Sequence, residues 1–178
     1  MVGKSNGKLK VTRTSDTTFT MQRVFDAPRT LVFETMTTPE YVKRWWCCME
    51  GYTMPVCEID LRVGGKWRYV MVGPEGEVGF HGEYREIDAP ARIVQTEIFD
   101  PFPDHPSLGT MTLEERDGKT HYQTVIVHDS KESCDAHLNS GMEVGANIAL
   151  DRLEEVAQSL NTAARGTPAS APRAPAST

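Results

Sequence analysis

The sequence has no apolar run near the roughly 20 residues that a membrane-spanning helix needs. The stretch from Met1 to Ser15 is polar and basic and has no apolar core, so we expect no secretory signal there. Cysteine is scarce: the chain has four, and no two have the C-x-x-C spacing of a zinc or redox motif. We therefore expect free thiols and a cytoplasmic protein, and we assign no role to the adjacent pair Cys47 and Cys48.

Signatures of catalysis are missing as well. The chain contains no Gly-x-Ser-x-Gly, Walker, Gly-x-Gly-x-x-Gly or His-Glu-x-x-His motif. Its five histidines are scattered, and none has metal-ligand spacing to another. We expect no metal and no cofactor, and the sequence favours a binding function over an enzymatic one.

Positive charge is sparse in the centre of the chain. The formal net charge is −6, and basic residues outnumber acidic ones only near the two ends. An acidic central part repels phosphate backbones, so we expect no nucleic-acid partner.

Composition divides the chain into three parts. Residues 1–16 are polar and basic and predict a flexible leader, and residues 161–178 are a tail of Ala, Pro, Ser and Thr that we expect to be disordered. Residues 17–160 carry nearly all the large apolar side chains and predict a single domain, expected to be a monomer or a weak homodimer.

Hydrophobic periodicity predicts an α+β fold for that domain. A strand over 17–25 precedes two short helices, and alternating strands separated by turns follow as far as residue 128. Near the end, a long helix over 141–160 has apolar or small residues at steps of three and four. The most economical packing is one curved antiparallel sheet wrapped around this long C-terminal helix.

The order of several short motifs resembles the activator of Hsp90 ATPase homologue-like family, within the START-like or helix-grip superfamily. The resemblance covers about residues 20–160 and rests on these segments: Ala27-Pro28, Val32-Phe33, Thr38-Pro39-Glu40, Arg44-Trp45-Trp46, Glu58 to Tyr69, His81 to Ile87, Asp88 to Arg92 and Gly141 to Gly145. It implies one helix-grip domain that encloses a hydrophobic cavity.

The sequence departs from the family pattern at two places. Cys47-Cys48 follows the tryptophan pair where the family usually has Gly-Pro, and Ala146-Asn147 replaces the usual Trp-Ser in the last helix. Because Ala146 lies on the apolar stripe of that helix, its small side chain predicts a larger cavity, or one refilled by Met142 or the tryptophans.

Candidate cavity residues come from the aromatic strand faces and from the helix stripe. They are Trp45, Trp46, Trp67, Tyr69, Phe80, Tyr84, Met142 and Ala146. Three polar residues could face the same space: Glu58 and Glu97, which are flanked by apolar strand residues, and His128 at a strand end. A carboxyl group in an apolar cavity has a raised pKa, which suits proton transfer.

Three functions are consistent with this reading. The first is the binding of a small apolar molecule in the cavity, which requires only a pocket. The second, implied by the family resemblance, is a co-chaperone-like or stress-response module with a chaperone or another protein as partner. The third is a cyclase-like or hydrolase-like enzyme acting in the same cavity. The sequence favours ligand binding, because it shows no recognisable acid–base pair or nucleophile and no separate chaperone-binding domain.

Overall fold

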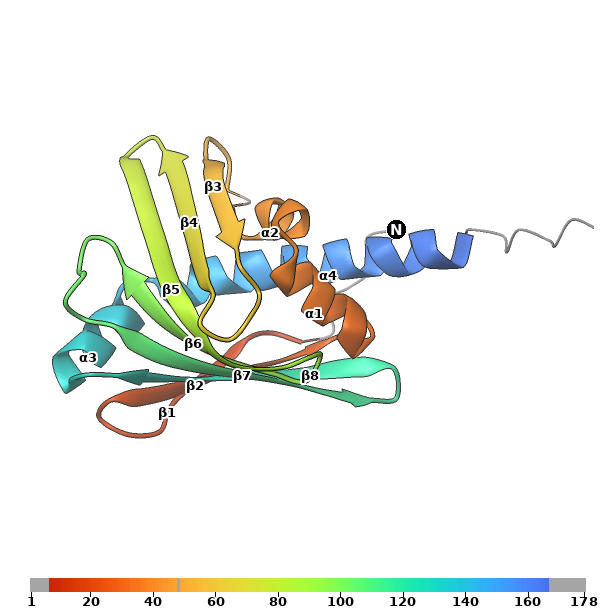
Figure 1. Cartoon of the computed structure of the whole chain (residues 1–178). Helices are drawn as coiled ribbons and strands as arrows, with labels where there is room; N and C mark the ends of the chain where they lie inside the picture. Colours follow the sequence, from red (N-terminus) through yellow and green to blue (C-terminus); the bar gives the residue numbers. More distant parts are fainter. Residues whose placement is uncertain (1–6, 48, 167–178) are drawn as a thin grey trace, which may run out of the picture.

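The computed structural model describes residues 7–47 and 49–166, which form one curved sheet and four helices (Figure 1). The strands are β1 (Lys10–Arg13), β2 (Thr18–Phe25), β3 (Thr53–Ile59), β4 (Lys66–Gly73), β5 (Gly76–Asp88), β6 (Arg92–Phe99), β7 (Ser107–Arg116) and β8 (Lys119–His128). The helices are α1 (Arg29–Thr37), α2 (Pro39–Trp45), α3 (Lys131–Asn139) and α4 (Met142–Gly166). No described helix combines the length and apolarity that a membrane span requires.

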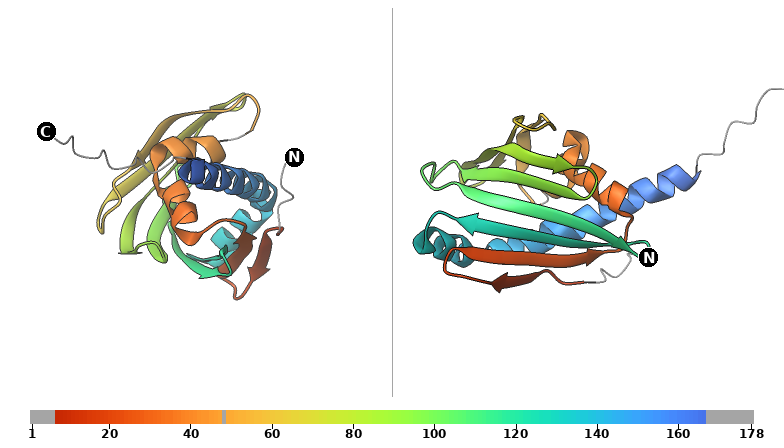
Figure 2. Two further views of the ribbon diagram at one scale, coloured as in Figure 1. Left: turned by 90° about the vertical axis from the view of Figure 1, so that its right-hand side faces the viewer. Right: turned by 60° about the horizontal axis from the view of Figure 1, so that its bottom comes forward.

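All neighbouring strands are antiparallel, in the order β1-β2-β8-β7-β6-β5-β4-β3. The view along α4 shows the sheet curving around that helix, with α1 and α2 beside it (Figure 2). The predicted fold class is therefore confirmed: a curved antiparallel sheet holds a long C-terminal helix, and two short helices follow the strand over 18–25. We call the surface of the sheet that faces α4 the inner face.

The core lies between the inner face and the second half of α4. Leu153 and Ala157 on the helix are completely buried, and so are Phe19 and Phe25 on β2. The earlier part of the helix stripe is less covered, since Met142 and Ala146 are only half-buried. The core is thus tightest along the second half of the helix.

A buried ion-pair network fastens α4 to the sheet. Arg23 of β2 points inward among apolar side chains, and its guanidinium lies 2.8 Å from the Glu154 carboxylate and 2.6 Å from that of Asp151. Glu154 also accepts a hydrogen bond of 2.7 Å from the backbone N–H of Asp26. The Arg23–Glu154 pair is buried, whereas the Asp151 carboxylate is about half exposed, and together the two pairs connect α4 to β2.

The expected leader over 1–16 is partly ordered, which corrects the sequence-based prediction. Residues 10–13 form strand β1 along the edge of β2, and Leu9 is buried in the core. The backbone N–H of Leu9 donates a 3.0 Å hydrogen bond to the Asn147 side chain on α4. Residues 1–6 lie outside the described residues. At the other end, α4 continues to residue 166, beyond the predicted 160, and the rest of the predicted tail (167–178) lies outside the described residues.

Leu9 provides a direct test of this ordered arm. We expect Leu9→Ala to lower the free energy of unfolding by about 2–3 kcal/mol, because a buried leucine is replaced by a small cavity. Lys8→Ala changes an exposed neighbour and should be close to neutral. Urea denaturation of both variants measures the difference, and equal stabilities would show that the arm is loose.

Candidate functional site

Aromatic side chains from α2, β4 and β5 form one contiguous cluster on the inner face. The Trp46 ring, at the C-terminal end of α2, lies 5.1 Å from the Tyr69 ring and 5.9 Å from the Phe80 ring, centroid to centroid. Trp45 contacts Trp46 at 5.5 Å, and Trp67 contacts Tyr69 at 4.9 Å. We call these five residues the aromatic cluster. The structure therefore brings together five of the residues that the sequence nominated.

The members of the aromatic cluster differ in exposure. Trp45, Trp67 and Tyr69 are buried and belong to the core. Trp46 and Phe80 are half-buried, although both pack against the core. The other aromatic candidate, Tyr84, is also buried. Trp46 and Phe80 are thus the aromatic candidates whose surfaces are still available to another molecule.

Gly82 sets the orientation of Trp67. The Trp67 indole N–H donates a 3.2 Å hydrogen bond to the Thr96 carbonyl oxygen on β6. A Cβ atom at Gly82 would lie 1.8 Å from that oxygen and 2.7 Å from the indole nitrogen. Only glycine fits beneath this bond, so Gly82 is what allows the Trp67 ring to cross between the strands.

The first turns of α4 carry small and flexible side chains. Gly141, with a φ of 82°, makes the turn from α3 into α4. Ala146 and Ala149 pack against the core but remain half-buried. Met142 is half-buried too and is not among the side chains packed on that core. At position 146 the helix contributes only a methyl group to this packing.

Glu97 and His128 both lie on the inner face. Ser107 on β7 lies between them: it is directly opposite Glu97 on β6 and directly opposite His128 on β8. Since residues directly opposite one another share a face, these three side chains form a polar row across β6, β7 and β8. The sequence indicated Glu97 and His128 but gave no sign of Ser107, whose place depends on strand register.

Burial raises the pKa of the Glu97 carboxyl group to about 7. The side chain is enclosed by protein atoms yet keeps a partly accessible surface. Within the described part of the chain, neither a hydrogen-bond donor nor a cation offsets this loss of hydration. The raised pKa means that the Glu97 carboxyl group titrates near neutral pH.

The two histidines at the end of the polar row both have lowered pKa values. The ring nitrogens Nε2 of His128 and Nδ1 of His137 on α3 lie 3.2 Å apart, and both rings contact Phe19. Burial, together with the neighbouring His128, lowers the pKa of His137 to about 4. Burial also lowers the pKa of His128. Burial thus favours the uncharged form of both rings.

Glu58 does not face the inner side, which corrects its nomination as a cavity group. Its neighbours Cys57 and Ile59 point inward, so strand alternation directs Glu58 to the opposite face, where it is exposed beside Arg68. There it borders a shallow hollow of about 220 Å³ with the side chains of Lys66 and His81. Asp100 lies close by and bridges Arg68 at 2.9 Å and His81 at 2.7 Å.

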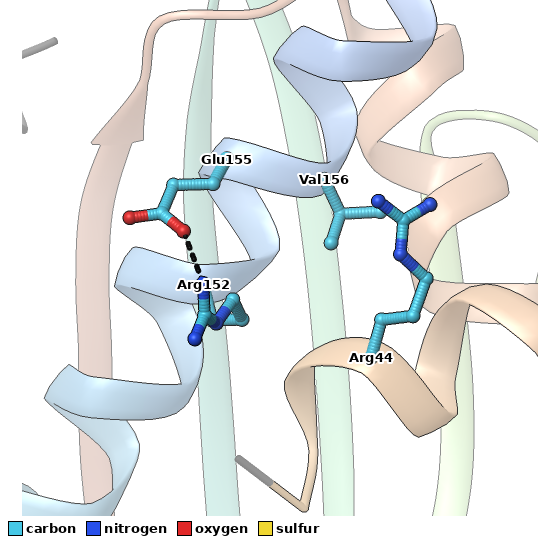
Figure 3. Close-up of a pocket in the computed structure, with 4 residues that line it drawn as sticks. All are labelled: Arg44, Arg152, Glu155 and Val156. Atoms are coloured by element: carbon cyan, nitrogen blue, oxygen red, sulfur yellow. Dashed lines mark hydrogen bonds and ion pairs between the residues drawn. The ribbon is translucent and has the colours of Figure 1, made fainter. Parts of the chain in front are cut away.

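A second hollow, of about 300 Å³, opens between α2 and α4 (Figure 3). It is lined by Arg44, Arg152, Glu155 and Val156, and Arg152 is paired with Glu155 at 2.7 Å. None of the residues nominated from the sequence lines it. Among the described residues, no group of three or more His, Cys, Asp or Glu side chains is placed to hold a metal ion.

This arrangement, a curved antiparallel sheet closed around one long helix with an aromatic and partly polar inner face, is the helix-grip architecture. Residues 26–158 match the family model described as "Activator of Hsp90 ATPase homolog 1-like protein". The chain belongs to that family, as the sequence motifs predicted. A comparison with curated proteins finds no significant match.

Solved structures give the same result for the fold. A Rhodobacter sphaeroides protein is 24% identical, with a TM-score of 0.79 over 85% of this chain and 99% of its own. A Mycobacterium smegmatis protein is 27% identical, with a TM-score of 0.73 over 83% of this chain and 94% of its own. An AHSA1-like protein from Aeromonas hydrophila is 18% identical, with a TM-score of 0.61 over 80% and 94% of the two chains.

Proposed function

We propose that this protein binds a small apolar molecule between the inner face and the first turns of α4. The observation that carries the proposal is the uneven covering of the inner face. Beneath the second half of α4 the side chains are closed off, whereas Trp46, Phe80 and Ala146 stay partly exposed although they pack on the core. Exposed apolar surface in a concave region is typical of ligand sites.

Two further features support a binding site at this place. Met54 on β3 and Met111 on β7 are also half-buried at the edge of the core, and methionine side chains adapt to bound apolar molecules. Glu97 is enclosed by protein and still partly accessible, as expected of a group that borders incompletely filled space. The hollow between α2 and α4 is lined mostly by charged side chains and fits an apolar molecule less well.

Contact quenching of tryptophan fluorescence tests this function. The chain has three tryptophans, and of these we expect a neutral brominated alkane to quench mainly Trp46, because Trp45 and Trp67 are buried. The quenching should saturate and should disappear in Trp46→Phe. Leu108→Ala, an exposed position outside the site, should leave it unchanged. Quenching that never saturates, or that persists in Trp46→Phe, would contradict a site at the aromatic cluster.

A further inference from the structure

The polar row of Glu97, Ser107 and His128 borders the aromatic cluster at one end of the proposed site. Burial is the main reason that the pKa of Tyr69, a member of the cluster, is raised, and the nearby charge of Glu97 adds to it. The same two causes, in the same order, raise the pKa of Tyr122 on β8 to about 12. Glu97 therefore lies within electrostatic reach of both tyrosines, at the boundary between the aromatic and the polar parts of the inner face.

Among the described residues, no side chain donates a hydrogen bond to the Glu97 carboxyl group. The hydroxyl group of Tyr122 is hydrogen-bonded to the side chain of Thr124. The hydroxyl of Ser107 lies 3.5 Å from the backbone carbonyl oxygen of Glu97, which is a weak contact. This contact does not involve the Glu97 carboxyl group. His128 and His137 contact each other through Nε2 and Nδ1, and burial lowers the pKa of both rings, which disfavours a positive charge beside Glu97. The buried Nδ1 of His128 has no hydrogen-bond partner among the described residues.

A carboxyl group without partners at the wall of a binding site is costly unless a ligand supplies a donor. Resting on the proposed binding function, we propose that the ligand is an amphiphile: its apolar body contacts Trp46 and Phe80, and its head group donates a hydrogen bond to the Glu97 carboxyl group. Ammonium and hydroxyl head groups both have this chemistry. A carboxylate or phosphate head group does not, and it would be repelled because no cation faces Glu97 among the described residues.

Competition with a neutral apolar dye, Nile red, tests the head group. The competitors are four compounds with the same eight-carbon chain: octylamine, octanol, octyl methyl ether and octanoate. At pH 8 we expect the amine and the alcohol to displace the dye at concentrations about tenfold lower than the ether, which has no donor, since hydrogen bonds to charged groups are strong. Octanoate should be the weakest competitor. An amine stronger than the alcohol identifies an ammonium ligand, and the reverse order a neutral one.

Substitution of Glu97 tests whether its carboxyl group causes the preference for compounds with a donor head group. Glu97→Gln should reduce the advantage of octylamine over the ether to about twofold or less, because an amide attracts an ammonium group far less than a carboxylate does. Glu58→Gln, which changes a carboxyl group on the outer face, should leave all four affinities unchanged. In wild-type protein, ¹³C NMR of the Glu97 carboxyl group should show its pKa falling from about 7 when octylamine binds, a readout that does not depend on the variants.

The possible failures are distinguishable. Saturable dye binding with equal displacement by all four compounds would overturn the head-group inference and leave the binding function standing. Loss of the amine preference in Glu58→Gln but not in Glu97→Gln would also overturn it. An absence of saturable dye binding would overturn the binding function and this inference with it.

Discussion

Glu154→Ala is expected to lower the free energy of unfolding by about 2–3 kcal/mol, because the buried guanidinium of Arg23 loses its enclosed partner and keeps the half-exposed carboxylate of Asp151. Arg23 and Glu154 are 4% and 3% exposed, so water cannot replace the lost carboxylate. The substitution also removes the acceptor for the Asp26 N–H. Urea denaturation monitored by circular dichroism measures the change.

The neighbouring residue Glu155 provides a matched control. It belongs to the same helix and pairs with Arg152 at 2.7 Å, but both side chains are about half exposed. Glu155→Ala should therefore cost less than about 1 kcal/mol. If Glu154→Ala costs no more than this control, the Arg23 network does not hold α4 on the sheet. The double substitution Arg23→Leu with Glu154→Leu should be less harmful than Glu154→Ala, since it removes the buried guanidinium together with its enclosed carboxylate.

Ala146→Trp is expected to weaken the binding of Nile red at least tenfold. A tryptophan at this position occupies on the order of 100 Å³ more than alanine, in the region where the inner face is least covered. Filling this region with protein atoms should leave the melting temperature of the unliganded protein unchanged or raise it. Dye titrations and melting curves of the two proteins measure both effects.

Val144→Trp is the control for this substitution. Val144 lies two residues away on the same helix and is 67% exposed, so the new ring should remain in solvent and the dye affinity should not change. Equal dye affinities in wild type and Ala146→Trp would show that position 146 is outside the site. A strongly destabilised Ala146→Trp would show instead that neighbouring side chains already fill the region.

The sequence predicted the elements with strong periodicity and missed the one without it. The strands over 66–73 and 92–99 and the helix that begins near residue 141 are where their apolar patterns place them. Strand β1 has a single apolar residue, Val11, between polar ones, and it forms because the edge of β2 offers unpaired backbone groups. The sequence of β1 alone does not indicate that β2 is available as a pairing partner.

The candidate site was predictable in its aromatic part and undecided in its polar part. Aromatic alternation on β4 and β5 correctly placed Trp67, Tyr69 and Phe80 on one face. Glu58 and Glu97 could not be told apart by sequence, because both lie in strands beside apolar residues. Their opposite orientations follow from strand parity: Cys57 and Ile59 occupy the inner positions around Glu58, whereas Glu97 itself occupies an inner position next to Phe99 along the strand.

By itself, the sequence determined the family and the fold class, because the order of strands, short helices and final helix is written in local periodicity and turn residues. Only the tertiary structure decided which side chains meet. Arg23 and Glu154 are 131 positions apart, and Leu9 and Asn147 are 138 apart. The alignment of Glu97, Ser107 and His128 depends on the register of three strands. Contacts of this kind arise from the curvature of the sheet and the position of α4, which depend on the packing of the whole core.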